Sequence, residues 1–339
     1  MKAIQLLGPN VLEVRDVPIP VPDTGEVLIK VNAVGICGTD LSIYKGITPA
    51  PYPIVLGHEF CGVIIEVGPG VENVKQGDYV ISEASWGCGT CYFCQRGQQS
   101  YCEKPLMYGR TCDGALAEYV KAPARIVHSI STNVDPVEAQ GVTAVATTLR
   151  AIRRSGLGVG QSAAILGPGY AGLLLLQLAK QSGAYPVIIT GTNEERLHLA
   201  RSLGADLTVD IRQEGWMNKI LAATGGYGPD VVIEATGRPE AVQQGVQMVK
   251  KGGKVLAFGI TNFPAEAFEV GLLYKKDISV VGSKGGYFEY GNAVKILESR
   301  RLKTRELVTH VFKLDETPKA FSFVTSNSRA AVRAVIVVN

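Results

Sequence analysis

Two rhythms of hydrophobic and polar positions divide this chain. Up to about residue 130, short β-branched runs alternate apolar and polar residues and are separated by Pro- and Gly-containing breaks. Clear examples lie at residues 3–6, 26–31 and 62–67. A period of two bounded by turn residues is typical of half-buried strands. The first part of the chain therefore predicts an antiparallel β domain of barrel or sandwich type.

From residue 134 the pattern changes to strands that alternate with helices. A helical stretch runs towards residue 154, and apolar runs of strand length then alternate with amphipathic stretches of about 11–14 residues, as in βαβ units on a parallel sheet. The predicted strands are 163–166, 186–190, 230–235, 254–258 and 278–281, and the helices between them are 170–182, 193–203 and 239–249. Beyond residue 290 we expect a helix to residue 300, a strand near residue 310, a helix over 315–324 and a last strand over 334–338.

Composition narrows the class of protein. A length of 339 residues favours two domains at roughly 150 residues each, and 46% hydrophobic residues are enough for large cores. A net charge of +3 argues against nucleic acid or an anionic membrane as partner. No run reaches the roughly 18 apolar residues of a membrane span, and the first residues continue as a strand without the apolar block of a signal peptide. We therefore expect a cytoplasmic protein whose partner is neither nucleic acid nor a membrane.

A glycine-rich turn follows the predicted strand 163–166. Gly167, Gly169 and Gly172 have the spacing G-x-G-x-x-G, and Tyr170 and Ala171 lie between the last two. A dinucleotide pyrophosphate needs a tight turn, close backbone approach and the free N–H groups of a helix start. The strand–turn–helix setting favours a dinucleotide site over a Gly-rich turn without a ligand.

The end of the next predicted strand bears on the choice of cofactor. NAD sites place an Asp or Glu there for the ribose hydroxyls, but this chain has Thr190, Gly191 and Thr192. Without a carboxylate a 2′-phosphate is not repelled, and Thr190, Thr192 and Arg196 can hydrogen-bond it. The pattern favours NADP. NAD is the alternative, because a glutamate of the following helix could reach the ribose.

Four of the seven cysteines fall within fifteen residues. The spacing is Cys88-x-x-Cys91-x-x-Cys94-x7-Cys102, and cysteines of a cytosolic chain more often bind metal than form disulfides. Four thiolates saturate a tetrahedral zinc ion and leave no reactive position, which predicts a structural zinc site. An iron–sulfur cluster and four unliganded cysteines are the alternatives.

A second group of metal-ligand residues lies closer to the N-terminus. Cys37, Thr39 and Asp40 form a Cys-Gly-Thr-Asp motif, and His58 and Glu59 follow Gly57 at the head of a predicted strand. Cys and His are zinc-ligand types, and a catalytic zinc needs three protein ligands and an open position. Taken singly, Cys37 and His58 would more often be buried structural residues, but the paired motifs favour a catalytic metal.

In this order, Gly-x-Cys-Gly-Thr-Asp, Gly-His-Glu, the four-cysteine segment and G-x-G-x-x-G resemble the zinc-dependent medium-chain dehydrogenase/reductase family, which includes alcohol, sorbitol and threonine dehydrogenases. The resemblance covers essentially the whole chain, including residues 229–237. It implies an α/β protein with a GroES-like catalytic domain over residues 1–146 and 287–339, with a structural zinc lobe at about 85–104. A Rossmann NAD(P)-binding domain would span 147–286.

The resemblance also implies roles for single residues. Cys37, His58 and Glu59 would bind the catalytic zinc, Asp40 would orient His58, and Thr39 would exchange the substrate proton. Cys88, Cys91, Cys94 and Cys102 would hold the structural zinc. The implied cofactor contacts, besides those of the glycine turn, are Thr236, then Phe258, Gly259 and Ile260 beside the nicotinamide, and Arg333 at the pyrophosphate.

The chain departs from the family pattern at two positions. Ser42 stands where many relatives carry a His that completes a proton relay, so the relay would be shortened or water-mediated. Thr143 stands where the third zinc ligand is expected, and a neutral hydroxyl is a poor ligand for zinc. We expect Glu59 to complete the ligand set. A shifted register with Glu138, or a weak or absent catalytic zinc, are the alternatives.

These features together predict a zinc-dependent NAD(P) oxidoreductase that interconverts a secondary alcohol, such as a polyol or a threonine-like compound, and its ketone. One alternative is a zinc-independent NADP reductase of the same superfamily. Another is a non-catalytic nucleotide-binding protein, against which the intact Cys37, Thr39, His58 and Glu59 argue. The resemblance further implies a homodimer or homotetramer.

Overall fold

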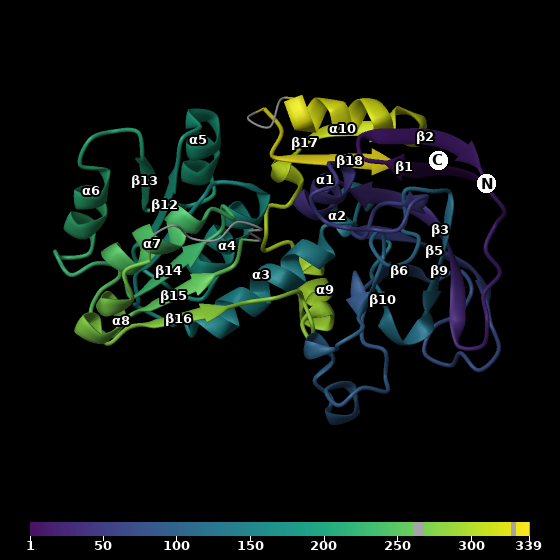
Figure 1. Cartoon of the computed structure of the whole chain (residues 1–339), viewed down its shortest axis with the longest axis horizontal. Coiled ribbons are helices and arrows are strands. Elements are labelled where there is room, and N and C mark those ends of the chain that lie inside the picture. The colour runs from purple at the N-terminus through teal and green to yellow at the C-terminus, as the bar shows by residue number, and fades with distance from the viewer. Residues whose placement is uncertain (260–267, 327–329, 339) are drawn as a thin grey trace. The chain divides into compact units, whose positions relative to one another are not determined.

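The computed structural model describes residues 1–259, 268–326 and 330–338, so the predicted cofactor contact Ile260 lies outside the described residues. The chain forms two compact units (Figure 1). Unit 1 comprises Met1–Ala146 and Tyr287–Asn339, and unit 2 comprises Thr147–Gly286. The boundary after Ala146 falls within helix α3 (Val142–Ser155). Within the described ranges, no helix has both the length and the apolar character needed to cross a membrane.

Unit 1 is built on a seven-stranded sheet in which strands from both ends of the chain pair. Its order is β10-β6-β5-β3-β18-β17, and β9 also pairs with β3. The strands are β3 (Glu26–Gly35), β5 (Phe60–Val67), β6 (Tyr79–Ser82), β9 (Tyr119–Pro123), β10 (Val127–Ser129), β17 (Val308–Lys313) and β18 (Arg333–Val337). The pairs are antiparallel, as the alternation predicted, except that β17 and β18 are parallel, which the sequence pattern did not indicate.

Smaller elements of unit 1 surround this sheet. A three-stranded sheet has the order β2-β1-β4, and a two-stranded sheet of β7 and β8 brackets the cysteine-rich segment. The bounds are β1 (Lys2–Gly8), β2 (Val11–Asp16), β4 (Ile54–Val55), β7 (Ser85–Trp86), β8 (Leu106–Met107), α1 (Gly38–Tyr44), α2 (Pro136–Ala139), α9 (Tyr290–Glu298) and α10 (Thr317–Ser326). Alternate residues of β3, including Val27, Ile29 and Val31, join α10 residue Phe321 in one apolar core.

Unit 2 is a parallel sheet of six strands with the order β13-β12-β11-β14-β15-β16. The bounds are β11 (Ala163–Leu166), β12 (Val187–Gly191), β13 (Leu207–Asp210), β14 (Val231–Glu234), β15 (Lys254–Ala257) and β16 (Ser279–Gly282). The strand order reverses at β11, so the switch point where dinucleotides bind in such sheets lies between β11 and β14. The predicted α/β class, with one β-rich and one doubly wound unit, is confirmed.

Helices connect the strands of unit 2. They are α4 (Tyr170–Gln181), α5 (Glu194–Ser202), α6 (Trp216–Ala223), α7 (Pro239–Met248) and α8 (Val270–Lys276). The predicted bounds of the first strand–helix unit agree with β11 and α4 to within one residue. The sequence analysis did not name β13, α6 or α8. Each is short, and β13 has only four residues with a single buried side chain, Val209, so its hydrophobic period carries little signal.

Candidate metal centres and cofactor edge

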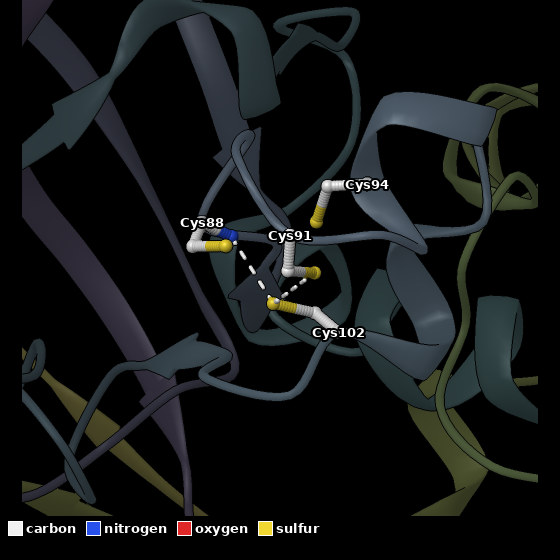
Figure 2. A group of neighbouring side chains, drawn as sticks. All are labelled: Cys88, Cys91, Cys94 and Cys102. Atoms are coloured by element: carbon white, nitrogen blue, oxygen red, sulfur yellow. Dashed lines mark hydrogen bonds between the residues drawn. The ribbon is translucent and has the colours of Figure 1, made fainter.

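Four cysteines of unit 1 converge on one point. Their sulfur atoms all lie within 4.8 Å of one another, and Figure 2 shows the side chains turned towards a common centre. The Cys88 N–H donates to the Cys102 sulfur at 3.3 Å, and the Cys91 and Cys102 sulfurs are 3.8 Å apart. Cys94 begins a short 3₁₀ helix, Cys94–Arg96, that turns its sulfur back towards the others. The arrangement fits one tetrahedral ion with four thiolate ligands.

The surroundings of these thiols change their acidity in opposite directions. A hydrogen bond from the Thr90 hydroxyl lowers the pKa of Cys88 to about 6, whereas burial raises the pKa of Cys94 to about 12. Four sulfurs this close cannot all ionise without a cation because the thiolates repel one another. A divalent ion removes that conflict, so the donor set matches a metal better than a cluster of free thiols.

Asp40 organises the second candidate centre. Its carboxylate is 1% exposed and accepts hydrogen bonds from the Cys37 N–H at 2.9 Å and the Gly57 N–H at 3.2 Å. The other contact is the His58 ring, whose Nδ1 is 3.1 Å from Oδ1. Cys37 caps α1 and His58 lies just before β5, so Asp40 ties together two segments about twenty residues apart. The contact leaves His58 Nε2 available to a metal, as expected of a carboxylate behind a histidine ligand.

Cys37, His58 and Glu59 form a three-ligand group. One donor atom from each lies within 4.8 Å of the others, and His58 Nε2 is 3.9 Å from Glu59 Oε1. Burial by itself would lower the pKa of His58, but the carboxylate of Asp40 raises that pKa well above its ordinary value. The pocket thus favours positive charge. A thiolate, an imidazole and a carboxylate at this spacing fit zinc, whose ligands lie about 2.0–2.3 Å from the ion.

Glu59 is itself held from behind by Arg333. The Arg333 guanidinium pairs with Glu59 Oε2 and donates to Gln140 Oε1 at 2.6 Å and to the Ile36 carbonyl at 2.9 Å. Arg333 is 4% exposed and begins β18, which pairs with β3 at the end of the chain. The sequence analysis assigned Arg333 to the cofactor pyrophosphate. The structure places its guanidinium on Glu59 and Gln140, and a pyrophosphate contact stays a prediction.

Thr143, the residue at the expected third-ligand position, hydrogen-bonds another side chain. Thr143 is buried, and its side chain hydrogen-bonds the hydroxyl of Tyr290, which also accepts the Ala84 N–H at 3.0 Å. Glu138, the shifted-register alternative, accepts a hydrogen bond from Thr304 at 3.0 Å and is not part of the three-ligand group. Of the two candidate carboxylates, Glu59 and not Glu138 belongs to the group with Cys37 and His58.

Helix α1, which follows Cys37, carries two hydroxyl side chains. Thr39 is half-buried and, within the described part of the chain, its side chain has no hydrogen-bond partner. Ser42, one turn later, is paired with the Thr48 hydroxyl at 2.7 Å. The Thr39 hydroxyl is therefore available to a ligand, whereas the Ser42 hydroxyl already has a partner.

The glycine-rich turn of unit 2 lies at the carboxyl end of β11. Gly167 has φ +111°, which an L side chain rarely adopts, and Gly169 caps α4 just before Tyr170 and Ala171. Gly172 packs so tightly against the Gly167 carbonyl that a Cβ atom would overlap it. The free N–H groups of the α4 start are thus presented at the switch point of the sheet.

The other predicted cofactor residues of unit 2 lie at the same edge. Thr236, Phe258 and Gly259 follow β14 and β15. Thr190 and Gly191 are buried at the end of β12, and Thr192 is exposed in the turn before α5. Arg196 is half-buried in the first turn of α5, where burial lowers its pKa. Neither β12 nor Thr192 after it supplies a carboxylate at the position where NAD sites carry an Asp or Glu.

Sequence reasoning missed two groups of residues. Gln140 and Tyr290 carry no motif, and only the tertiary contacts with Arg333 and Thr143 reveal them. Glu234 lies in the segment 229–237 that contributed to the resemblance, but no role was assigned to it. Its position at the end of an apolar strand, directly before Ala-Thr-Gly, was the available signal.

Two models of known protein families match this chain. Residues 23–132 match the family model described as alcohol dehydrogenase GroES-like domain, and residues 171–299 match the model described as zinc-binding dehydrogenase. Together the two matches cover more than half of the chain. The first corresponds to part of unit 1, and the second lies mainly in unit 2.

Relatives that match nearly the whole chain are also dehydrogenases. The chain is 35% identical to L-threonine 3-dehydrogenase of Pyrococcus furiosus over 94% of both chains. It is 33% identical to sorbitol dehydrogenase of Halalkalibacterium halodurans over 96% of both. A crystal structure from Sinorhizobium meliloti, described as a zinc-binding dehydrogenase bound to NADP, has TM-score 0.94 and 32% identity and covers 99% of this chain and 98% of its own. The chain therefore belongs to the zinc-dependent medium-chain dehydrogenase/reductase family of alcohol and polyol dehydrogenases, which confirms the predicted resemblance, enzyme class and type of reaction.

Proposed function

We propose that this protein is a zinc-dependent NAD(P) dehydrogenase that interconverts a polyol, or a β-hydroxy compound such as threonine, and its ketone. The observation that carries the proposal is the group of Cys37, His58 and Glu59, whose donor atoms lie within 4.8 Å of one another. Three protein ligands leave a coordination position for substrate oxygen, which is typical of catalytic zinc. The threonine and sorbitol dehydrogenases among the relatives support this substrate class.

Each residue of the candidate centre has a separate task. Cys37, His58 and Glu59 would bind zinc, Asp40 would hold His58 with Nε2 forward, and Arg333 would fix the orientation of Glu59. When bound, zinc supplies the Lewis acidity that favours loss of the alcohol proton, and the nicotinamide ring accepts the hydride. Thr39 would take the alcohol proton, since its hydroxyl has no other partner within the described part of the chain. Ser42 would play a smaller part because Thr48 occupies its hydroxyl.

Unit 2 would bind the cofactor along the carboxyl edge of its sheet. Gly167, Gly169 and Gly172, with the N–H groups of Tyr170 and Ala171, would hold the pyrophosphate. Thr236, Phe258, Gly259 and Ile260 would lie along the nicotinamide half. A preference for NADP is supported by the absence of a carboxylate at Thr190, Gly191 and Thr192 and by the nearby Arg196. The relative solved with NADP is consistent with that choice.

Unit 1 would then be the catalytic domain and would carry a second, structural zinc ion. Cys88, Cys91, Cys94 and Cys102 supply four sulfurs, so no position remains for substrate. This ion would stabilise the segment between β7 and β8 without taking part in the reaction. A homodimer or homotetramer remains a prediction from the family resemblance.

The deciding experiment combines metal quantification with a cofactor-reduction assay. Native mass spectrometry should find two zinc ions per chain, and a mild chelator should remove one of them and abolish alcohol-dependent reduction of NAD(P). One zinc ion per chain with full activity after chelation would identify a zinc-independent reductase instead. Cofactor binding without turnover of any alcohol in a panel of polyols, hydroxy amino acids and simple secondary alcohols would identify a non-catalytic protein.

A further inference from the structure

A buried carboxylate closes the central strand β14 of unit 2. Glu234 is 1% exposed, and its Oε1 accepts three hydrogen bonds, from the Thr236 N–H at 2.5 Å, the Thr236 hydroxyl at 2.6 Å and the Gly237 N–H at 2.7 Å. Its Oε2 accepts the Gly259 N–H at 3.1 Å. The carboxylate thus bonds the loop that follows its own strand and also the loop that follows β15.

The charge of Glu234 is balanced by these donors alone. No ion pair of Glu234 with Lys or Arg is found among residues 1–259, 268–326 and 330–338. Burying a carboxylate is costly unless several hydrogen bonds satisfy it, and bonds to a charged oxygen are stronger than neutral ones. An apolar residue at the last position of β14 could be buried at a lower cost in free energy. The carboxylate is therefore best explained by the loops that it holds.

The same cluster also reaches the phosphate-binding turn. A Cβ atom placed on Gly167 would lie 2.7 Å from the methyl group of Thr236, so the two loops are in close contact. A Cβ atom on Gly259 would lie 2.6 Å from Gly237 Cα and 2.8 Å from Glu234 Oε2. The loops after β11, β14 and β15 therefore meet without space for another side chain. Glu234 hydrogen-bonds the loops after β14 and β15, and Thr236 lies close to the loop after β11.

We propose that Glu234 is a positioning residue for the nicotinamide half of the cofactor. Its hydrogen bonds set the loop of Gly259 against the loop of Thr236, and the Thr236 methyl group lies close to the turn of Gly167 without a bond to it. These loops lie at the carboxyl edge beside the switch point, where a dinucleotide binds in such a sheet. The inference rests on the proposed NAD(P) function and adds a residue that touches the cofactor loops and not the cofactor itself.

Glu234→Gln tests this role with little change in shape. The amide places an N–H₂ group against donors that need an acceptor, so the junction between the two loops loosens. We expect the Kd for NADPH or NADH, measured by fluorescence titration, to rise about tenfold, as for the loss of one hydrogen bond to a charged group. The Kd for the corresponding ADP-ribose, which lacks nicotinamide, should change less than about twofold because the start of α4 still holds the pyrophosphate. Glu240→Gln, an exposed glutamate in the first turn of α7, is the matched control and should leave both constants unchanged.

Thr236→Val keeps a branched side chain of the same shape but removes the hydroxyl that donates to Glu234 Oε1, and it serves if Glu234→Gln does not fold. It should show the same separation between the reduced dinucleotide and ADP-ribose. Equal weakening of both ligands, together with a lower melting temperature, would reduce Glu234 to a structural residue and overturn the proposal. Unchanged affinity for both ligands in folded Glu234→Gln would overturn it as well. Absence of reduced-cofactor binding by the unsubstituted protein would instead contradict the proposed function, and this inference with it.

Discussion

The buried guanidinium of Arg333 pairs with the carboxylate of Glu59, a residue 274 positions earlier in the chain. The last strand of the sheet thus supplies the group that holds one proposed zinc ligand. Gln140 and the Ile36 carbonyl accept two further hydrogen bonds from the guanidinium, which hold it in one orientation. Glu59 Oε2 is occupied by this contact, which leaves Oε1 on the side of His58. The pair therefore fixes Glu59, the carboxylate that we propose as the third ligand in place of Thr143.

Loss of the Arg333 guanidinium should therefore affect stability and metal binding together. Arg333→Met removes the guanidinium that pairs with the buried carboxylate of Glu59, and breaking such a pair costs about 3–5 kcal/mol in the free energy of unfolding. We expect denaturant titration to show that loss, and zinc analysis to show a weakened catalytic site. Arg333→Lys keeps the positive charge but not the planar guanidinium. Its stability and its zinc content should lie between those of Arg333→Met and the unsubstituted protein. Unchanged zinc content in a folded Arg333→Met protein would contradict the role assigned to Arg333.

Removal of a proposed zinc ligand should abolish turnover while cofactor affinity is preserved. Cys37→Ala or His58→Ala should lower kcat by more than the roughly 10–100-fold typical of losing a residue that only orients a ligand. The Kd for NAD(P)H should stay within about twofold of the unsubstituted value, because the glycine-rich turn and the other predicted cofactor residues except Arg333 lie in unit 2. Cys112→Ala, which removes a cysteine outside both metal groups, is the control. Wild-type turnover in both ligand variants would exclude the zinc mechanism.

Asp40→Asn should weaken the same site without removing a ligand. The amide keeps the size of the side chain but removes the negative charge that raises the pKa of His58 and strengthens its ring as a donor. Affinity for the catalytic zinc should fall about 10–100-fold. Competition with a chromophoric chelator measures this directly. Equal chelator sensitivity of the Asn variant and the unsubstituted protein would show that Asp40 has only a structural role.

The four-cysteine site should respond through stability before activity. Cys94→Ser removes one thiolate from a closed set, and metal binding by such a site contributes directly to the free energy of folding. The variant should lose one zinc ion per chain and melt at a lower temperature, by several degrees or more. Cys112→Ser provides the matched control because Cys112 is a half-buried cysteine outside the group. An unchanged metal content together with an unchanged melting temperature would rule out a structural zinc site.

The choice between NADP and NAD can be tested at Thr192 and not at Gly191. A side chain on Gly191 would place its Cβ 2.5–2.6 Å from the Pro168 ring, so a substitution there would disturb the phosphate-binding turn for both cofactors. Thr192 is exposed in the turn that follows β12. Thr192→Asp should repel the 2′-phosphate and lower kcat/KM for NADP about tenfold relative to NAD, whereas the uncharged Thr192→Asn should not. If both variants keep the original NADP/NAD ratio, this position does not read the phosphate.

Local sequence patterns predicted much of this architecture because they depend on neighbouring residues. The strand Ala163–Leu166 and the helix after it could be recognised from an apolar run, three glycines and a helical period. The spacing of Cys88, Cys91 and Cys94 likewise indicates a shared ligand before any fold is known. By contrast, β13 and α6 are short and only partly buried, so their composition does not distinguish them from loops.

The sequence thus predicted the residue types of the candidate sites and their order along the chain. Cysteine, histidine and glycine residues at those spacings are typical of few kinds of site. The sequence did not predict the partners of these residues. Arg333 reaches Glu59, Thr143 turns to Tyr290, and Glu234 bonds Gly259 only because strands and helices from distant segments pack together. Such contacts depend on strand pairing and burial across the whole unit, and no periodicity within a dozen residues encodes them. Folding therefore decides which carboxylate joins Cys37 and His58 and which one bonds the loops after β14 and β15.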